Sequence, residues 1–231
     1  MHSNMIAAVV TRRWQLAQGY HAVEVETRHR SEVPPFDDGA IIDLTRDHEC
    51  RTVRSHPLWH LPSRVDAFVV GVRQEADTEA VRDVSDFSWN RGDELYIGRP
   101  RNTEILMDCN SRYILFSAGL GVTAIYGIAK RLAAAEILFE IHNFARTLER
   151  TLFREELDSL SAYGRVHHRI GLKEEEIELA TSLALSPTHA NSQIIFSGPP
   201  SFMKQIGRQA REWVYPSNIH KILLGEKGVR G

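Results

Sequence analysis

The chain has 231 residues, with 28 Lys or Arg against 30 Asp or Glu, so its formal net charge is −2. This near-neutral balance argues against a protein built mainly to hold nucleic acid, and 42% hydrophobic with 25% charged residues excludes a disordered or low-complexity chain. The sequence contains no run of about 18 apolar residues, so no membrane span is predicted. Residues 1–5 lack the basic and apolar segments of a secretory signal, so we expect a cytoplasmic protein.

Only two cysteines occur, Cys50 and Cys109. Two thiols cannot supply the four ligands of an iron–sulfur cluster or of a structural zinc ion, and no C-x-x-C pattern is present. We therefore expect two unpaired thiols in a reducing compartment and no iron–sulfur cluster in this chain.

The first hundred residues are typical of β-structure. Short runs rich in β-branched residues alternate with turn-forming Gly, Pro and Asp, including Gly19, Pro57 and Pro62. Strands at this spacing predict a small antiparallel barrel or sandwich. The predicted strands cover residues 6–10, 22–26, 40–44, 67–72 and 94–98.

From about residue 111 the pattern changes to strands that alternate with helices, which predicts a parallel sheet covered on both faces. The composition shifts between Pro100 and Asn110, so we predict an α+β protein of two domains, residues 1–107 as an antiparallel β-barrel and residues 108–231 as an α/β domain. The predicted strands here are residues 112–117, 137–142, 166–168 and 193–197. The predicted helices follow residue 121 and cover residues 151–160 and 201–213.

A glycine-rich turn joins the first of these strands to its helix. Gly119 and Gly121 lack a Cβ, so the backbone can turn tightly there and a diphosphate can approach its N–H groups closely. The helix that follows directs its positive N-terminal end to the same point. Glycines also close strand–helix turns that bind nothing, so this turn alone leaves nucleotide binding open.

Three further residues favour a nucleotide site. Thr123 offers a hydroxyl to a phosphate, and Arg146 and Thr147 follow the next strand at the carboxyl edge of the sheet, where the ligands of parallel sheets bind. As alternatives, Arg146 is a solvated loop charge and Thr147 is a helix cap.

Several motifs then resemble one protein family in order and spacing. They occur at residues 36–44 (FDDGAIIDL), 92–93, 100–102, 117–123 (SAGLGVT), 140–147 and 196–203 (FSGPPSFM). Over about residues 6–224 the chain resembles the ferredoxin–NADP reductase superfamily, specifically reductases of the phthalate dioxygenase and vanillate demethylase type. The resemblance implies a flavin-binding barrel and an NAD(P)-binding α/β domain, without the plant-type ferredoxin domain of those proteins.

The resemblance also implies the site residues. Ser197 and His56 are the predicted catalytic residues, one beside the nicotinamide and one against the flavin. The predicted cofactor-binding residues are Arg54, His56, Pro57 and Leu58 for the flavin, Ala118, Gly119, Gly121, Val122, Thr123, Arg146 and Thr147 for the dinucleotide, and Ser197, Gly198 and Pro199 beside the nicotinamide.

Departures from the family pattern gather around the flavin. Pro57 stands where the family has a serine that bonds the flavin, and proline has neither hydroxyl nor N–H. Residues 79–84 contain no glycine where the family has a phosphate cradle, Ser197 replaces a cysteine, and residues 219–224 lack the family's acidic and aromatic pair.

The function that these residues favour is that of an NAD(P)H-dependent flavin oxidoreductase. It would use FMN or FAD with NADH or NADPH, and deliver electrons to a separate oxygenase or ferredoxin-like iron–sulfur protein. One alternative is a non-redox structural or regulatory subunit that has lost flavin, and another is a free flavin reductase. The sequence leaves the oligomeric state open.

No metal site is predicted, although the chain has 11 histidines. His56 and His60 have helical i, i+4 spacing, but Pro57 and Pro62 make a helix there implausible and no carboxylate completes a ligand set. The adjacent pair His167 and His168 carries no motif of its own.

Overall fold

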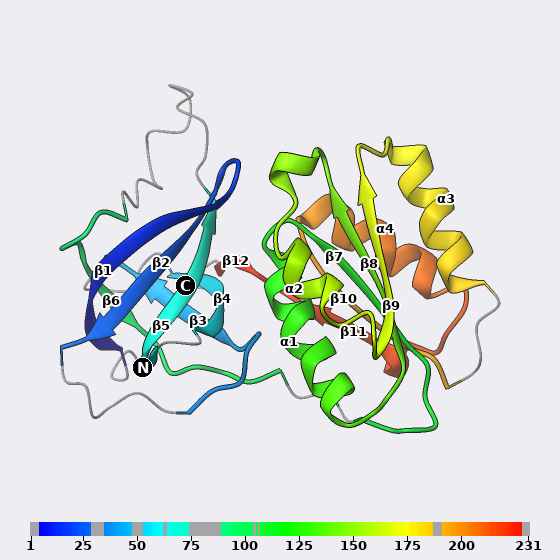
Figure 1. The fold of residues 1–231 in the computed structure, drawn as a ribbon, viewed down its shortest axis with the longest axis horizontal. Helices are drawn as coiled ribbons and strands as arrows, with labels where there is room; N and C mark the ends of the chain where they lie inside the picture. The colour runs from blue at the N-terminus through cyan, green and yellow to red at the C-terminus, as the bar shows by residue number, and fades with distance from the viewer. Residues whose placement is uncertain are drawn as a thin grey trace. The chain divides into compact units, whose positions relative to one another are not determined.

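The computed structural model describes residues 5–28, 35–47, 53–61, 64–73, 89–103, 105, 107–186 and 191–227 (Figure 1). The chain divides into two compact units. One is Met1–Asn102 with Leu224–Gly231, and the other is Thr103–Leu223. The boundary predicted from the sequence, between residues 107 and 108, differs in two ways: it assigns residues 103–107 to the first unit and the C-terminal segment to the second. Among the described residues, no helix has the length and apolar character of a membrane span.

The first unit is an antiparallel barrel. Its strands run in the order β12-β4-β3-β6-β1-β2-β5, and an additional pairing of β4 with β5 closes the sheet on itself. Alternate residues such as Ile42 and Leu44 are fully buried in the interior, as the two-residue period of a strand requires. The strands are β1 (Ile6–Ala17), β2 (Tyr20–Thr27), β3 (Ile41–Thr45), β4 (Val53–Leu61), β5 (Arg64–Arg73), β6 (Glu94–Ile97) and β12 (Gly225–Lys227).

Strand β4 was not predicted, because Pro57 in its middle is typical of a turn. Ladder pairing explains how the proline is accommodated. On the side away from β3, β4 pairs with β12 up to Ser55 and with β5 from Leu58 onward. Pro57 lies in the gap between the two partners, where a missing N–H breaks no ladder bond.

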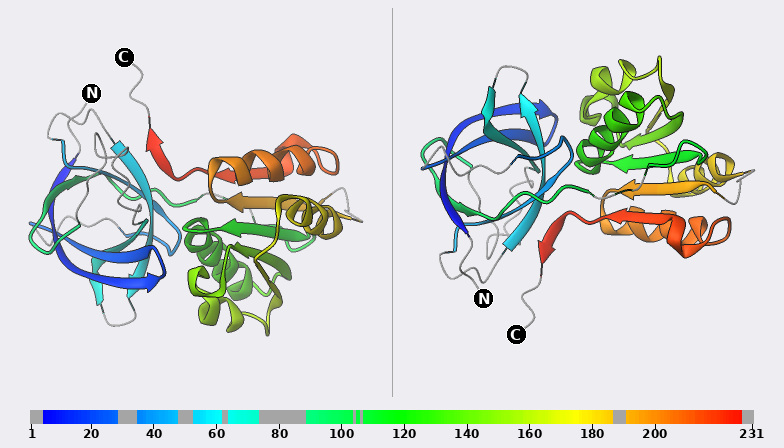
Figure 2. Two further views of the ribbon diagram at one scale, coloured as in Figure 1. Left: turned by 90° about the horizontal axis from the view of Figure 1, so that it is seen from above. Right: turned by 90° about the horizontal axis from the view of Figure 1, so that it is seen from below.

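The second unit is a five-stranded parallel sheet in the order β11-β10-β7-β8-β9. Figure 2 shows α4 on one face of the sheet and α1 with α2 on the other. The strands are β7 (Tyr113–Ala118), β8 (Phe139–Ala145), β9 (Gly164–Ile170), β10 (Gln193–Ser197) and β11 (Ile219–Ile222). The helices are α1 (Gly121–Ala134), α2 (Arg154–Asp158), α3 (Glu174–Leu185) and α4 (Pro200–Ala210), with short 3-10 turns η3 (Leu148–Arg150) and η4 (Pro216–Asn218).

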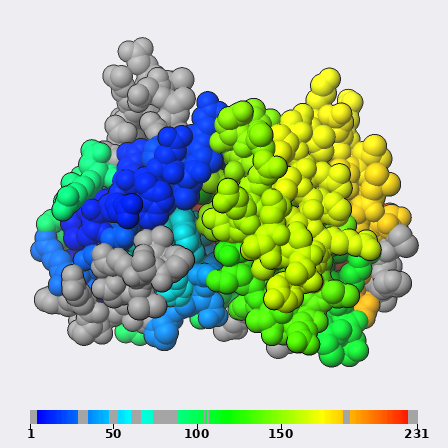
Figure 3. Space-filling view, in the orientation of Figure 1, coloured from blue at the N-terminus to red at the C-terminus, as the bar shows by residue number. Residues whose placement is uncertain are grey.

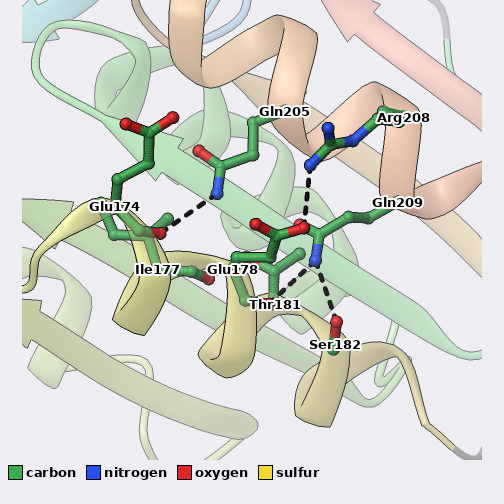
Figure 4. Close-up of polar contacts among 8 residues, drawn as sticks. All are labelled: Glu174, Ile177, Glu178, Thr181, Ser182, Gln205, Arg208 and Gln209. Atoms are coloured by element: carbon green, nitrogen blue, oxygen red, sulfur yellow. Dashed lines mark hydrogen bonds and ion pairs between the residues drawn. The ribbon is translucent and has the colours of Figure 1, made fainter.

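Helix α3, which was not predicted, lies beside α4 and is joined to it by polar contacts (Figure 4). The Gln209 side-chain amide donates to the Glu178 carbonyl and to the Ser182 hydroxyl, each at 2.9 Å. Arg208 pairs with the Glu178 carboxylate at 2.8 Å. These contacts fix two helices that cover the same face of the sheet.

The predicted fold class is confirmed. The chain has an N-terminal antiparallel barrel and a parallel sheet with helices on both faces. The predicted strand 193–197 coincides with β10, whereas the predicted helix 151–160 shortens to α2. It starts late because Phe153 adopts a left-handed conformation with φ +54°.

Candidate functional site at the carboxyl edge of the parallel sheet

The turn between β7 and α1 leaves the helix N-terminus free of side-chain caps. Leu120 is the N-cap residue, no side chain bonds the first amides, and the first turn of α1 holds no acidic residue. Gly119 has φ +53°, a conformation that glycine adopts without strain. A helix end of this kind attracts an anion through its amides and its dipole.

Gly121 seats this turn on the end of β10. A Cβ at this position would lie 2.2 Å from the Ser197 carbonyl oxygen and 2.3 Å from its carbon. A Cβ on Gly198 would lie 2.7 Å from the Phe202 ring and 3.2 Å from the Ala118 Cβ. The two glycine turns therefore pack on one another, and neither position has room for a side chain.

Two of the predicted site residues use their hydroxyls inside the protein. The Thr123 hydroxyl donates to the Leu120 carbonyl at 2.7 Å, and the Ser197 hydroxyl donates to the Ile222 carbonyl at 2.9 Å. Thr123 is only 1% exposed and Ser197 is fully buried. The Thr123 hydroxyl thus stabilises the turn before α1, and the Ser197 hydroxyl stabilises the pairing of β10 with β11.

Arg146 and Thr147 follow β8, and both are exposed. Thr147 is the N-cap residue of η3. The pKa of Glu149 is lowered by its own backbone N–H and by a hydrogen bond from the Thr147 hydroxyl. The Thr147 side chain makes no capping bond to the η3 backbone, because its hydroxyl bonds the Glu149 carboxylate, and Arg146 is exposed beyond the end of the strand.

The other predicted nucleotide residues lie around the same edge. Ala118 ends β7 and is half-buried, Val122 is fully buried in the first turn of α1, and exposed Pro199 is the N-cap of α4. Segments 118–123, 146–147 and 197–199 thus come from the ends of three neighbouring parallel strands, β7, β8 and β10. The sheet brings this predicted group together.

The predicted flavin residues all lie on β4 of the barrel. Leu58 is fully buried in the barrel core, and Pro57 is buried as well. Arg54 and His56 are half-buried. Of these four side chains, only Arg54 and His56 can therefore contact a group outside the barrel. Residues 79–84, where the family has its phosphate cradle, lie outside the described residues.

His56 is held by contacts within the barrel. Its Nδ1 donates to the Gly71 carbonyl at 3.0 Å, and its ring meets Trp89 edge-on, with centroids 5.5 Å apart. Burial lowers the pKa of His56 to about 4, and nearby Arg54 also lowers it. The imidazole is consequently neutral at pH 7.

An ion pair that the sequence did not suggest lies beside this strand. Arg101 makes two hydrogen bonds to Asp43, of 2.6 and 2.9 Å, and the Ser55 hydroxyl donates to Asp43 at 2.6 Å. The hydrogen bonds that Arg101 donates to Asp43 raise the pKa of Arg101 above its ordinary value. The 100–102 motif marked Arg101 in the sequence, but nothing there identified its partner.

A second polar cluster lies on β8 and β9, away from the carboxyl edge. Glu140 accepts from His142 at 3.0 Å and from Arg112 at 3.0 Å, and His167 lies 3.3 Å from the same carboxylate. The hydrogen bond from His142, together with Arg112, lowers the pKa of Glu140 to about 2. Burial lowers the pKa of His142, more than its bond to Glu140 raises it.

Comparison of the whole chain with known proteins finds reductases. The chain is 27% identical over 198 residues to a vanillate O-demethylase oxidoreductase of Acinetobacter baylyi, a match covering 86% of this chain and 61% of the relative. It is 29% identical over 209 residues to the protein of that name from Pseudomonas putida, covering 90% and 64%. The chain thus spans about three fifths of the length of these relatives, and no family model matches it.

Solved structures show the same fold. Phthalate dioxygenase reductase, described as a modular structure for electron transfer from pyridine nucleotides to [2Fe-2S], matches with a TM-score of 0.70 at 18% identity. The match covers 94% of this chain and 67% of that one. A ferredoxin reductase of carbazole 1,9a-dioxygenase matches with a TM-score of 0.72 at 15% identity, covering 94% and 68%. The resemblance that the motifs suggested is confirmed by relatives bearing the names of that reductase type.

Proposed function

We propose that the chain is an NAD(P)H-dependent flavin oxidoreductase, the reductase component of an oxygenase system. It would deliver electrons to a separate iron–sulfur protein or oxygenase. The observation that carries the proposal is the packing of the glycine turn before α1 on the glycine turn that follows β10, in a chain whose relatives are named as reductases of such systems.

The dinucleotide half of the proposal is supported by the carboxyl edge of the parallel sheet. The uncapped N-terminus of α1 would bind the diphosphate through its amides, and Gly119 and Gly121 keep that approach free of side chains. Arg146 would pair with a phosphate on the adenosine side. Thr123 and Ser197 would support these turns through their bonds to backbone carbonyls rather than through contacts to the nucleotide.

The flavin half is supported by the relatives and by two barrel residues. Arg54 would meet the flavin phosphate, and neutral His56 would offer the edge of a flat ring. A bound flavin would supply the conversion of a hydride into two single electrons. Pro57 and Leu58 offer it no polar group, so we expect flavin to be held more weakly than a site with a serine at position 57 would hold it.

The absorbance of the purified full chain tests the flavin assignment. We expect a yellow protein, or a colourless one that acquires flavin absorbance when FMN or FAD is added and is bleached by NADH or NADPH without oxygen. A chain that stays colourless with both flavins would refute the oxidoreductase assignment.

Arg146 provides a separate test of the dinucleotide site. Because a charge-assisted bond to phosphate contributes about 1.5 kcal/mol or more, Arg146→Ala should raise the Kd for NADH or NADPH about tenfold. Fluorescence titration of the nucleotide measures this. Arg211→Ala is the matched control, since Arg211 is exposed at the opposite end of α4 and should leave the Kd unchanged. Equal effects of the two substitutions would remove Arg146 from the site.

A second candidate function is a non-redox subunit that keeps dinucleotide binding. The observation that favours it is Pro57, which removes a hydrogen-bond donor from the strand that should face the flavin. Saturable nucleotide binding by a chain that takes up neither FMN nor FAD would support this candidate over the first.

A further inference from the structure

Three metal-ligating side chains meet on one face of the parallel sheet, although 27 positions separate the first from the last in the sequence. Glu140 and His142 are two residues apart on β8, so both point to the same face. The parallel register places His167 of β9 directly beside His142. Strand β9 is the edge of this sheet, next to β8 (Figure 1).

The geometry converges on one oxygen of Glu140. Its Oε1 lies 3.0 Å from the Nε2 of His142 and 3.3 Å from the Nε2 of His167. The three donor atoms all lie within 4.8 Å of one another. With metal–ligand distances of about 2.0–2.1 Å, two ligand atoms of a tetrahedral ion lie about 3.3 Å apart. The two distances to Oε1, 3.0 and 3.3 Å, are already close to that spacing.

Burial fixes two of the ligands and leaves the third accessible. The side chains of His142 and Glu140 are 1% and 14% exposed, whereas that of His167 is 37% exposed. The two imidazoles are stacked, with ring centroids 4.7 Å apart. Because more than a third of the His167 side chain is exposed, an ion can enter from the His167 side. Figure 3 shows the opposite face of this unit, the face on which α2 lies.

We propose that Glu140, His142 and His167 bind one divalent transition-metal ion, with zinc as the best match to two imidazoles and a carboxylate. The fourth position is left to water on the exposed side. Arg112 holds Oε2 of Glu140 at 3.0 Å and so turns Oε1 toward the histidines, as an outer-shell partner does.

Two features limit the affinity. Arg112 neutralises part of the carboxylate charge that would attract a cation. The Nδ1 of His142 is buried without a hydrogen-bond partner among the described residues, so a metal on Nε2 would leave a buried N–H unbonded. We therefore expect micromolar rather than nanomolar binding of zinc.

The site is independent of the proposed redox function. Glu140 and His142 lie in the first half of β8, whereas Arg146 follows its end. Bound metal would clamp the edge strand β9 to β8 without contacting the carboxyl edge. Failure of the flavin assignment would leave this inference untouched, and the reverse is also true.

The test uses the full chain without an affinity tag, treated with a chelator and then titrated with zinc in a calorimeter. Cobalt(II) is added in a parallel titration, because its visible absorption reports tetrahedral coordination. We expect one ion per chain, with zinc affinity falling at least about tenfold in His167→Gln and in Glu140→Gln. Circular dichroism checks that each variant is folded.

His168→Gln is the matched control. His168 neighbours His167 but points to the other face of β9, where its Nε2 bonds Asp158 at 2.8 Å. Its substitution should change zinc affinity by less than about twofold. The inference fails if the wild-type chain shows no saturable binding of one zinc ion, or if His167→Gln binds zinc as tightly as the wild type does.

Discussion

At the scale of single residues, glycine positions carry the clearest structural demand. Gly121 and Gly207 lie on helices of the same unit, but their surroundings differ. A Cβ on Gly121 would meet backbone atoms at 2.2 Å, whereas a Cβ on Gly207 would meet the tip of the Phe196 ring at 3.3 Å and the flexible Lys221 side chain at 3.4 Å. The backbone at the end of a strand cannot move aside to make room for a methyl group, whereas the end of a side chain can.

We therefore expect Gly121→Ala to lower the free energy of unfolding by about 3 kcal/mol through overpacking. Gly207→Ala should change it by less than about 1 kcal/mol, because a gain in helix propensity offsets the tight contact. Urea denaturation measures both. Similar effects of the two substitutions would contradict the close packing of the 121 turn on β10.

His56 predicts a pH dependence of stability. The unfolded chain gains a proton on this imidazole below its ordinary pKa of about 6.5, whereas in the folded barrel, where the ring Nε2 is buried, the pKa is about 4. Between these values only the unfolded state is protonated, so stability falls as the pH is lowered, by up to about 3 kcal/mol. Above pH 6.5 the group contributes no slope.

His56→Phe keeps a ring against Trp89 and removes the titrating group. The variant should lose less stability than the wild type between pH 6.5 and 4, as measured by denaturant unfolding at each pH. Parallel curves for the two proteins would show that His56 does not titrate as its burial requires.

At the scale of elements, the contacts between α3 and α4 include both buried and exposed ones (Figure 4). Gln209 is 4% exposed and makes two bonds to α3, while the Arg208–Glu178 pair has side chains 62% and 50% exposed. Gln209→Ala should cost about 1–2 kcal/mol of stability, and Arg208→Ala less than about 1 kcal/mol. Urea unfolding of both variants measures the ranking, which the reverse order would contradict.

Elements with a local pattern could be predicted from the sequence, and those set by distant partners could not. The apolar run of β10 and the glycine turn before α1 can each be recognised from their own residues. The prediction missed strand β4, because Pro57 is accommodated at a break in the strand's pairing. That break depends on the distant strands β12 and β5. The same holds for His142 and His167, since only the pairing of β8 with β9 brings them together.

Site residues divide in the same way. The sequence could predict that segments 118–123, 146–147 and 197–199 share one edge, because the carboxyl ends of parallel strands coincide. It could not predict that the Thr123 and Ser197 hydroxyls are bonded to backbone carbonyls, or that Leu58 faces the barrel core. Those outcomes depend on side-chain direction in the folded chain.

At the scale of the whole molecule, the chain leaves the barrel after Asn102, builds the entire second unit, and returns at Leu224. Strand β12 then adds three residues to the barrel by pairing with residues 53–55 of β4. The parallel-sheet unit is thus an insertion between two strands of the barrel sheet.

This topology makes β12 a reporter of folding in the other unit. If β12 pairs while residues 103–223 are unfolded, it closes a loop of about 120 residues, which costs about 4 kcal/mol of chain entropy. This cost is larger than the free energy that the hydrogen bonds of a three-residue strand contribute. Once the inserted unit is folded, that cost disappears. Amide exchange at residues 225–227 should therefore accelerate in Gly121→Ala together with the inserted unit, while exchange at Ile42 stays slow. Cooperativity between the two units would then be carried by the connectivity of the chain.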